Sequence, residues 1–376
     1  MKNISKGGIF LIDTLITTVG ASLSRSKYLN ENFSFSDILS IEDPANDRDL
    51  GAEINSTVSI IEDGKIDERR NLYLVHSATE SGRKISTFLK HFFEDHPEYS
   101  FQRVVTVEVE GLDNSDQFTF RTKGLRNLIR EFTKIYTNHG NIAINATAGF
   151  KAQTSFALIF GFMMKVPVYY RYESFSKAME IPPLPVNFEF SHWIENKDVF
   201  DLLEFGELTY DECLKAKNTD KSSFDNTINN LRMFLDIETI EGEKYIALNP
   251  IGELYVFATR TQLNETARQI SLAESSVPID KRFISNESEE HSKKFINKHW
   301  SDLRKIIELP FIEKIITSGY SDKFDRHRIT AKKIEDGKLK IQFSRKGGEL
   351  YMVAETTAKN DLELAYVISV IEGCNI

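Results

Sequence analysis

Short apolar runs alternate with helical patterns over residues 8–170. Apolar and β-branched runs at 9–12 (continuing to 19), 71–75, 104–109, 141–145 and 166–170 predict strands. Between them, apolar residues at helical spacing predict helices over 88–93, 125–136 and 153–164. Because strands that alternate with helices form parallel sheets covered on both faces, the predicted fold class is α/β.

The pattern changes after Pro182, Pro183 and Pro185, which end the alternating region. Residues 198–203 and 224–234 have helical spacing, and a hairpin of 237–240 and 244–248 follows, turning at 241–243. Helices followed by a hairpin favour a winged helix-turn-helix. The polar residues 261–290 have the composition of a connector.

The last 87 residues, 290–376, predict a small α+β unit. Helical spacing covers 295–307, 311–316 and 362–371, and strands are predicted over 326–334, 338–345 and 349–356. Glycine-containing turns at 335–337 and 346–348 suit hairpins. We therefore expect four segments: a sheet domain at 1–187, a winged helix at 188–262, a connector at 263–289 and an α+β domain at 290–376.

Composition places the chain among globular proteins of more than one domain. It has 376 residues, of which 41% are hydrophobic and 27% charged. Cys213 and Cys374 have no metal-ligand spacing, which argues against a zinc site or a disulfide framework and favours a reducing cytoplasm. The apolar run near the N-terminus is too short for a signal peptide or a membrane span, so we expect no membrane contact.

Charge is distributed unevenly along the chain. The net charge is −9, yet residues 321–346 contain nine basic and four acidic residues. An acidic body with a small basic region suggests that the two parts meet different partners.

Three loops that follow predicted strands, at 17–23, 77–82 and 145–151, are rich in small polar residues. Open α/β sheets bind ligands at the carboxyl ends of their strands, where small residues admit a phosphate and helix N-termini donate N–H groups to it. Such residues also occur in strand-to-helix turns for structural reasons alone. The candidate ligand-binding residues are Thr18, Gly20, Ala21, Ser22, Ser77, Thr79, Asn145, Thr147, Gly149, Phe150 and Lys151.

These loops carry a resemblance to the CARF domains of CRISPR-associated proteins, over residues 8–187. Residues 17–23 resemble the family's first-strand motif. Residues 145–151 resemble its Asn-x-Thr-Gly-Gly-x-Lys signature, with Ala148 where glycine is usual, and 169–173 and 181–185 are similar to the family's closing segment.

The resemblance implies a Rossmann-like domain that binds a cyclic oligoadenylate across the two-fold axis of a homodimer. That symmetry needs an even-numbered ring, the tetramer or the hexamer, and cyclic tetra-adenylate is the expected activator. No cofactor and no metal are implied.

Residues 195–257 are expected to relay ligand binding rather than to read DNA. Asp225, Asp236, Glu238, Glu241 and Glu243 would repel phosphates.

Basic residues on the predicted strands are the informative feature of 290–376. The candidate catalytic residues are Arg326, His327, Arg328, Arg345, Lys346 and Lys359. Basic groups on one sheet face hold RNA phosphates and stabilise the charge of a phosphorane. The alternative is that they only protect exposed strands from aggregation.

The layout of two helices, a short antiparallel sheet and a closing helix resembles the RelE family of ribosome-dependent mRNA interferases. The resemblance implies metal-independent attack of a 2′-hydroxyl on mRNA, on the ribosome. Together with the CARF resemblance, it implies an effector of type III CRISPR immunity. It also fits a known order among CRISPR effectors, sensor, winged helix and RelE.

Two alternatives stay open. One is a metal-dependent nuclease of the PD-(D/E)xK kind, using Glu349, Glu355 and Lys359, although Lys359 comes two residues too late for that motif. The other is a ligand-gated transcription regulator that acts through residues 195–257 and in which residues 290–376 are not catalytic.

Overall fold

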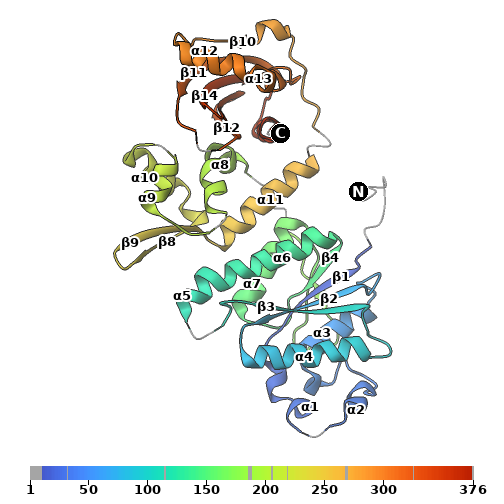
Figure 1. The fold of residues 1–376 in the computed structure, drawn as a ribbon. Coiled ribbons are helices and arrows are strands. Elements are labelled where there is room, and N and C mark those ends of the chain that lie inside the picture. The colour runs from blue at the N-terminus through green and yellow to red at the C-terminus, as the bar shows by residue number, and fades with distance from the viewer. Residues whose placement is uncertain are drawn as a thin grey trace. The chain divides into compact units, whose positions relative to one another are not determined.

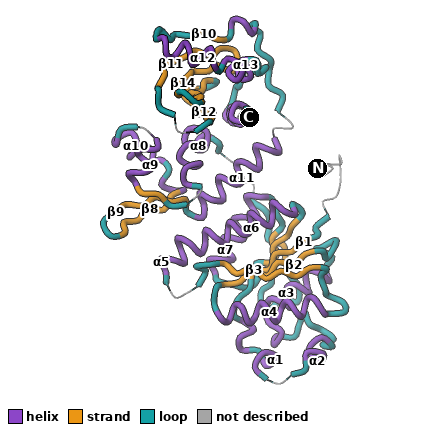
Figure 2. Tube along the Cα trace, viewed as in Figure 1, coloured by secondary structure: helices purple, strands orange, loops and turns teal. Residues whose placement is uncertain are grey.

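The computed structural model describes residues 11–31, 33–113, 116–184, 189–204, 206–217, 219–266, 270–324 and 326–374. The chain divides into two compact units, which we call unit 1 (Met1–Asn187) and unit 2 (Phe188–Ile376). Ile9, Phe10 and Pro185, used in the sequence predictions, lie outside the described residues. Both units mix helices and strands (Figures 1 and 2).

Unit 1 is built on a six-stranded sheet of order β3-β2-β1-β4-β5-β6. The strands are β1 (Thr14–Thr18), β2 (Asn71–Ser77), β3 (Arg103–Val109), β4 (Ile142–Asn145), β5 (Val168–Tyr170) and β6 (Met179–Glu180). The first five pair in parallel, and β6 is antiparallel to β5. The predicted parallel α/β sheet is therefore confirmed. Its first strand, however, starts at Thr14, and Leu11 to Asp13 have no regular structure.

The longer helices of unit 1 cover both faces of this sheet. In Figure 1, α3 (Gly51–Glu62) and α4 (Glu80–Asp95) lie on one side, and α6 (Leu125–His139) and α7 (Lys151–Met164) on the other. The short helices α1 (Lys27–Asn30) and α2 (Phe35–Leu39) lie outside these layers, whereas α5 (Gln117–Thr119) continues through residues 120–124 into α6. The completely buried strands β1 and β4 form the centre of the sheet, as expected for parallel strands covered on two faces.

Unit 2 begins with helices around a three-stranded sheet of order β7-β9-β8. Its elements are α8 (Ser191–Leu203), β7 (Leu208–Thr209), α9 (Tyr210–Lys217), α10 (Lys221–Asn230), β8 (Leu235–Ile240), β9 (Glu243–Leu248) and α11 (Pro250–Thr266). The hairpin lies where the sequence predicts it. Helix α11 was not predicted and runs into the region expected to be a polar connector.

The remainder of unit 2, which begins at β10 (Phe283–Ile284) and ends with α14 (Asp361–Gly373), is called the tail below. It has a five-stranded sheet of order β10-β11-β14-β13-β12. The strands are β10 (Phe283–Ile284), β11 (Ile312–Ser321), β12 (Arg328–Glu335), β13 (Lys338–Arg345) and β14 (Gly348–Thr356). Helices α12 (Glu290–Lys298), α13 (Trp300–Ile307) and α14 (Asp361–Gly373) complete it. The helix expected at 295–307 is thus two helices that meet at His299.

The helix expected at 311–316 is wrong, because residues 312–316 belong to strand β11. The pairing of β11 with β14 shifts between Ile312 and Lys314, which inserts an extra residue into β11. Ile312 and Ile315 are therefore both buried although three positions separate them. A bulge gives a strand the apolar spacing of a helix.

Candidate functional site

The three predicted ligand loops follow β1, β2 and β4, which are adjacent in the sheet. Because these strands are parallel, their carboxyl ends share one edge of unit 1. The chain reverses its direction of winding between β1 and β4. In doubly wound sheets this is where ligands bind. The structure therefore brings the predicted loop residues together at one edge, which we call the switch-point edge.

The loops after β1 and β4 touch through their backbones. A Cβ atom on Gly20 would lie 2.6 Å from the backbone N of Gly149, so only glycine fits there. The Thr18 hydroxyl donates to the carbonyl oxygens of Ala148 (2.5 Å) and Asn145 (3.2 Å). Thr18 thus binds the two loops together instead of pointing into solvent.

Asn145 organises the second of these loops from below. Its amide nitrogen donates to Ser56 Oγ (2.8 Å) and Thr57 Oγ1 (3.1 Å) of α3, and its oxygen accepts from the Thr147 hydroxyl (2.7 Å). Thr147 Oγ1 in turn accepts the backbone N–H of Arg171 (3.1 Å). The Asn145 side chain is completely buried, so it positions the loop, whereas the half-buried Thr147 lies closer to solvent.

The loop after β2 is a capped helix start. Thr79 accepts the N–H of Gly82 (3.0 Å) and shares a hydrogen bond with Ser77 Oγ (2.9 Å). Gly82 has no room for a side chain, because a Cβ atom would lie 2.6 Å from the Ser77 carbonyl oxygen. This close packing explains why the loop has small residues, and no ligand-binding role is needed to explain them.

Helix α7 starts at the switch-point edge. Phe150 is its N-cap residue and Lys151 its exposed first residue. The Phe150 ring packs edge-on against Phe120, with ring centres 5.4 Å apart. The first-turn N–H groups of a helix have no partner within the helix. Beside Lys151 they form a favourable environment for an anion.

Two buried residues of this site were missed by the sequence analysis. Glu53 of α3 accepts hydrogen bonds from the Gly20 N–H and the Ser22 hydroxyl, both at 2.7 Å. Burial raises the pKa of the Glu53 carboxyl. The apolar spacing of Ile54, Val58 and Ile61 could have revealed helix α3, but nothing in the sequence singles out Glu53.

Arg171 is the second missed residue. Its guanidinium donates to the carbonyl oxygens of Ala45 (2.5 Å), Asn55 (2.8 Å) and Phe175 (2.9 Å) and to Asn46 Oδ1 (2.8 Å). Burial lowers the pKa of this arginine. Arg171 therefore fastens the segment after β5 to α3 and to the loop before it.

In the tail, the structure gathers most of the predicted catalytic residues at one end of the sheet. Arg328 opens β12 opposite Ser344, and Arg345 ends β13 opposite Gly348. Arg326, His327 and Lys346 are exposed in the adjoining turns. Lys359 follows the far end of β14, so the structure does not bring it to the others.

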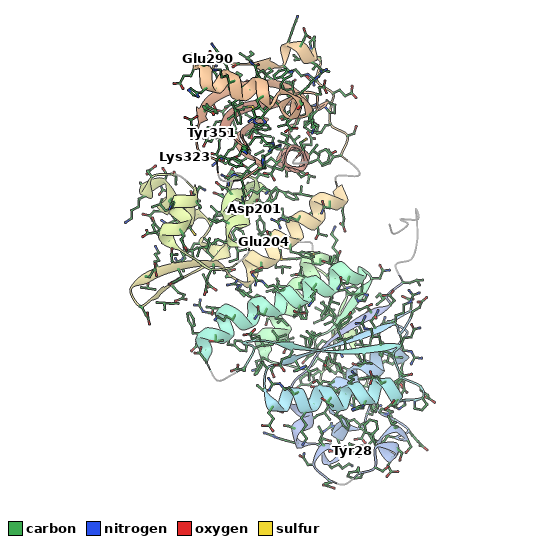
Figure 3. All side chains as sticks on the ribbon, viewed as in Figure 1. Tyr28, Asp201, Glu204, Glu290, Lys323 and Tyr351 are labelled. Carbon is green, nitrogen blue, oxygen red and sulfur yellow. The ribbon has the colours of Figure 1, made fainter. Side chains whose placement is uncertain are left out.

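Glu349 is the centre of a polar cluster on the face of the tail sheet opposite its hydrophobic core; Glu349 itself is buried, and the residues that contact its carboxylate are half-buried. Its carboxylate accepts from Gln342 Nε2 and Tyr351 Oη, both at 2.9 Å, and lies 3.5 Å from the guanidinium of Arg328. Burial, and then the bond to Glu349, raise the pKa of the Tyr351 phenol. Lys340 Nζ lies 5.7 Å from the centre of the Tyr351 ring. Figure 3 labels Tyr351 within the tail.

Arg345 does not lie on this face, although the sequence analysis made it a surface residue. It is 5% exposed, and its Nε donates to Asp302 (3.2 Å) while Nη1 donates to the Ser344 carbonyl (3.0 Å). Its guanidinium also lies 4.6 Å from the centre of the Phe343 ring. Arg345 therefore holds α13 against the sheet. Its role as a catalytic residue stays a prediction.

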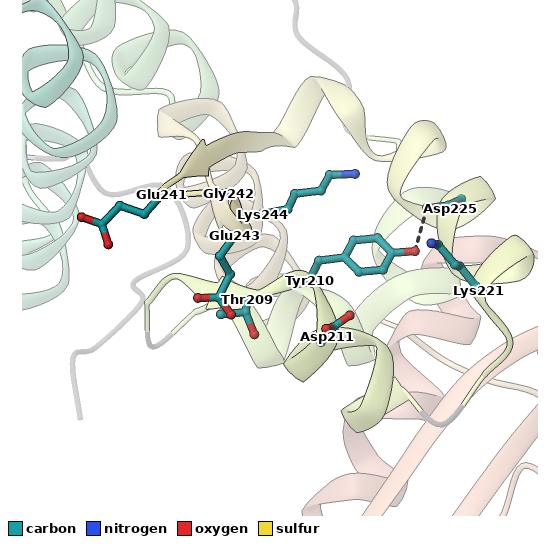
Figure 4. A pocket seen from close by; sticks show the side chains of 9 residues that line it. All are labelled: Thr209, Tyr210, Asp211, Lys221, Asp225, Glu241, Gly242, Glu243 and Lys244. Atoms are coloured by element: carbon teal, nitrogen blue, oxygen red, sulfur yellow. Dashed lines mark hydrogen bonds between the residues drawn. The ribbon is translucent and has the colours of Figure 1, made fainter.

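A surface pocket of about 590 Å³ lies between the hairpin turn, α9 and α10 (Figure 4). Lys244 lies over the Tyr210 ring, 4.8 Å from its centre, and Tyr210 donates to Asp225 (2.7 Å). Four carboxylates and two lysines line the pocket: Asp211, Asp225, Glu241, Glu243, Lys221 and Lys244. This excess of negative charge makes it a poor site for nucleic-acid phosphates.

Two further observations concern the described residues alone. They hold no group of three or more His, Cys, Asp or Glu side chains placed to bind a metal ion. Among the helices formed by these residues, none has both the length and the apolar character needed to span a bilayer.

The fold and its switch-point edge place unit 1 among the doubly wound α/β domains. Within it, residues 48–184 match the model of a family described as "CRISPR-associated protein (Cas_APE2256)". No curated protein matches the chain.

Two solved structures show distant similarity. Can2 from Sulfobacillus thermosulfidooxidans, in complex with cyclic tetra-adenylate, is 12% identical with a TM-score of 0.26, covering 70% of this chain and 71% of its own. Protein VC1899 from Vibrio cholerae is 8% identical with a TM-score of 0.25, covering 92% of this chain and 78% of its own. Neither likeness is close enough to assign a function.

Proposed function

We propose that unit 1 is a CARF-type sensor and that its ligand is a cyclic oligoadenylate, with cyclic tetra-adenylate the expected ring. One observation carries the proposal. The loops after β1 and β4, which bear the family-like residues, converge on the switch-point edge and touch at Gly20 and Gly149. The match of residues 48–184 to a CRISPR-associated family model supports it.

Sensing is proposed to occur in a homodimer. A ring-shaped ligand with two-fold symmetry presents the same phosphates to two identical edges. Each edge offers the N-terminus of α7 and Lys151. Ligand binding then favours the dimer state in which the tail is active.

The effector is proposed to be the tail, as a RelE-like ribonuclease that cuts mRNA on the ribosome in type III CRISPR immunity. The cluster of Arg328, Glu349 and Tyr351 supports a role in RNA binding, since a half-buried arginine and a half-buried phenol meet at the same carboxylate. In the proposed reaction the 2′-hydroxyl oxygen attacks the adjacent phosphorus. The bond to the leaving 5′-oxygen breaks, and a cyclic phosphate and a 5′-hydroxyl remain.

Arg328 is proposed to neutralise the charge that develops on the phosphorane. Arg326, His327 and Lys346 are exposed at the same end of the sheet and are proposed to hold the RNA backbone. Glu349 positions Arg328 and Tyr351. Arg345 acts through the fold, by joining Asp302 to the sheet.

A winged helix is proposed for the first part of unit 2. The order of helix α8, strand β7, helices α9 and α10 and hairpin β8–β9 supports it. The acidic pocket beside the hairpin argues against DNA as its ligand. We propose that this part transmits the state of the sensor to the tail.

The test is a cleavage assay in EDTA with translating ribosomes, naked RNA or DNA, each with and without cyclic tetra-adenylate. Activator-dependent cuts in translated mRNA are expected. Cleavage that appears only with Mg²⁺ or Mn²⁺ would favour a metal-dependent nuclease. DNA retention without cleavage would favour a regulator.

Site variants make the assay specific. Arg328→Ala should lower the cleavage rate by at least about a hundredfold and leave ligand affinity unchanged. Lys294→Ala is the matched control, because it removes one exposed cation from α12 in the same tail. Equal cleavage rates for both variants would show that the face of the tail sheet that carries Arg328 takes no part in cleavage.

A further inference from the structure

Glu53 is a buried carboxyl group directly beneath the proposed ligand loop. It is completely buried in the first turn of α3. Its two oxygens each take one donor of the loop after β1, the Gly20 N–H and the Ser22 hydroxyl. The Ser22 Oγ also accepts the N–H of Ala52 (3.3 Å), which ties the loop to the start of α3. The Gly20 N–H, a backbone donor of the predicted ligand loop, is thus held by the chain's own carboxyl.

No cation of the described part of the chain forms an ion pair with Glu53 that would balance its charge. Among the described residues, none of the ion pairs includes Glu53, and its bonded partners are an amide and a hydroxyl. Burial raises the pKa of this carboxyl, because it is removed from water without a compensating charge. The charged or titratable groups on neighbouring elements bond elsewhere or reach solvent: Arg25, Arg48, Asp49, Glu62, Asp63, His76, Lys151 and Arg171.

We propose that Glu53 is a positioning residue of the ligand site and that it takes up one proton when the polyanionic ring binds. The inference rests on the proposed function, since it needs phosphates at the loops of Gly20 and Gly149. A negative ligand beside a buried carboxylate disfavours the ionised form of that carboxylate.

The hydrogen-bond geometry allows both protonation states. A protonated Glu53 still accepts the Gly20 N–H through its carbonyl oxygen. Its hydroxyl then donates to Ser22 Oγ, and the Ser22 hydroxyl proton becomes available to the ligand. The proton comes from solvent, and no other group changes its charge.

Linkage sets the expected pH dependence. Where free Glu53 is ionised and bound Glu53 is protonated, affinity falls up to about tenfold for each unit that the pH rises. The fold itself responds in the same direction. A carboxyl whose pKa is raised in the folded state contributes stability at low pH, and this contribution is lost as the pH rises from its ordinary value through the folded value.

The test is calorimetric titration of the full chain with cyclic tetra-adenylate, between about pH 5.5 and 8.5, in buffers of different ionisation enthalpy. Wild-type protein should take up a proton, at most one per bound site, at those pH values that lie between the pKa of free and of ligand-bound Glu53. Glu53→Gln should take up none, because its amide mimics the protonated carboxyl. Its affinity at high pH should equal or exceed that of wild type.

Glu62→Gln is the matched control, because it removes a carboxylate from the last turn of the same helix. It should keep the wild-type proton uptake. A wild type without proton uptake overturns the inference, and that measurement needs no variant to fold. Equal uptake by wild type and Glu53→Gln also overturns it. No binding heat for any ring at any pH overturns the proposed function, and the inference with it.

Discussion

Gly20 and Gly149 set the distance between the two loops of the switch-point edge. Gly149 has a backbone φ of 107°, which non-glycine residues rarely adopt. Gly20 is required for space, since its Cα faces the backbone of Gly149. The small residues in these loops therefore allow the two loops to approach each other closely and leave the helix N-terminus accessible.

Gly20→Ala should open this contact. The new methyl group would meet the Gly149 backbone N at 2.6 Å, so one loop must move. We expect a loss of about 1–3 kcal/mol in the free energy of unfolding and at least a tenfold loss of cyclic tetra-adenylate affinity. Chemical denaturation and calorimetric titration measure the two effects.

Gly373→Ala provides the control for this variant. Its Cβ would have no neighbour within 4 Å, so stability and affinity should stay close to wild type. Wild-type affinity in Gly20→Ala would show that the ligand does not depend on the contact between the loops.

At the residue scale, the sequence identified exposed and small residues better than buried polar ones. The predicted loop residues do meet at one edge, because strand ends are visible as the limits of apolar runs. Glu53 and Arg171 escaped, and Glu349 entered only as a candidate of the alternative metal-dependent nuclease, since a buried charged residue looks like a surface residue in a hydropathy pattern. Arg345 was misplaced for the same reason: Asp302, its partner, is 43 positions away.

At the scale of elements, the outer edge of strand β12 is where helices α8 and α14 pack against the tail sheet. β12 ends the tail sheet, and its Ala331 N–H donates to Glu372 Oε1 of α14 (2.9 Å). Glu372 also pairs with Lys197 of α8 (2.9 Å), and Lys197 bonds Asp201. These carboxylates hold the pKa of Lys197 above its ordinary value although burial opposes the charge. Helix α8 thus covers an edge that could otherwise pair with another strand.

Lys197→Ala should weaken this packing. Its side chain and that of Glu372 are 13% and 16% exposed, so the variant leaves Glu372 largely buried without a cation. We expect a loss of about 3 kcal/mol in the free energy of unfolding of unit 2, measured by urea denaturation.

Lys294→Ala removes an exposed lysine that lies 3.8 Å from Glu290 and should change stability by less than about 0.5 kcal/mol. An equal, small effect of the two substitutions would mean that the α8–α14 ion pair contributes little to the stability of unit 2.

Elements with simple periodicity were predicted well, and interrupted ones were not. The strands of the parallel sheet and the hairpin β8–β9 follow their apolar patterns. The bulged β11 looked helical, and His299 divides a pattern that looked like one helix. Helices α3 and α11 were missed: polar residues that the structure buries lie among the apolar residues of α3, and α11 runs into the region interpreted as a polar connector.

At the scale of the whole molecule, the two units have separate hydrophobic cores. One core is formed by buried apolar residues between positions 15 and 169, all in unit 1. The other consists of residues 190–371 and is shared by the three-stranded sheet and the tail. The division of unit 2 into a winged helix, a connector and an α+β domain stays a prediction. We expect the three-stranded sheet and the tail to unfold together, because they share this core.

Separate cores predict two unfolding transitions in differential scanning calorimetry. In the proposed function only unit 1 binds cyclic tetra-adenylate, so ligand should raise the Tm of one transition alone. At free ligand a hundredfold above Kd the stabilisation is about 2.7 kcal/mol. Lys197→Ala identifies the transition of unit 2 by lowering it, and Gly20→Ala should reduce the ligand shift of the other at the same ligand concentration. A single transition, or equal shifts of both with ligand, would show that the units unfold as one body. Ligand binding to unit 1 would then stabilise the tail directly, and a change in the state of the tail within the dimer would not be needed.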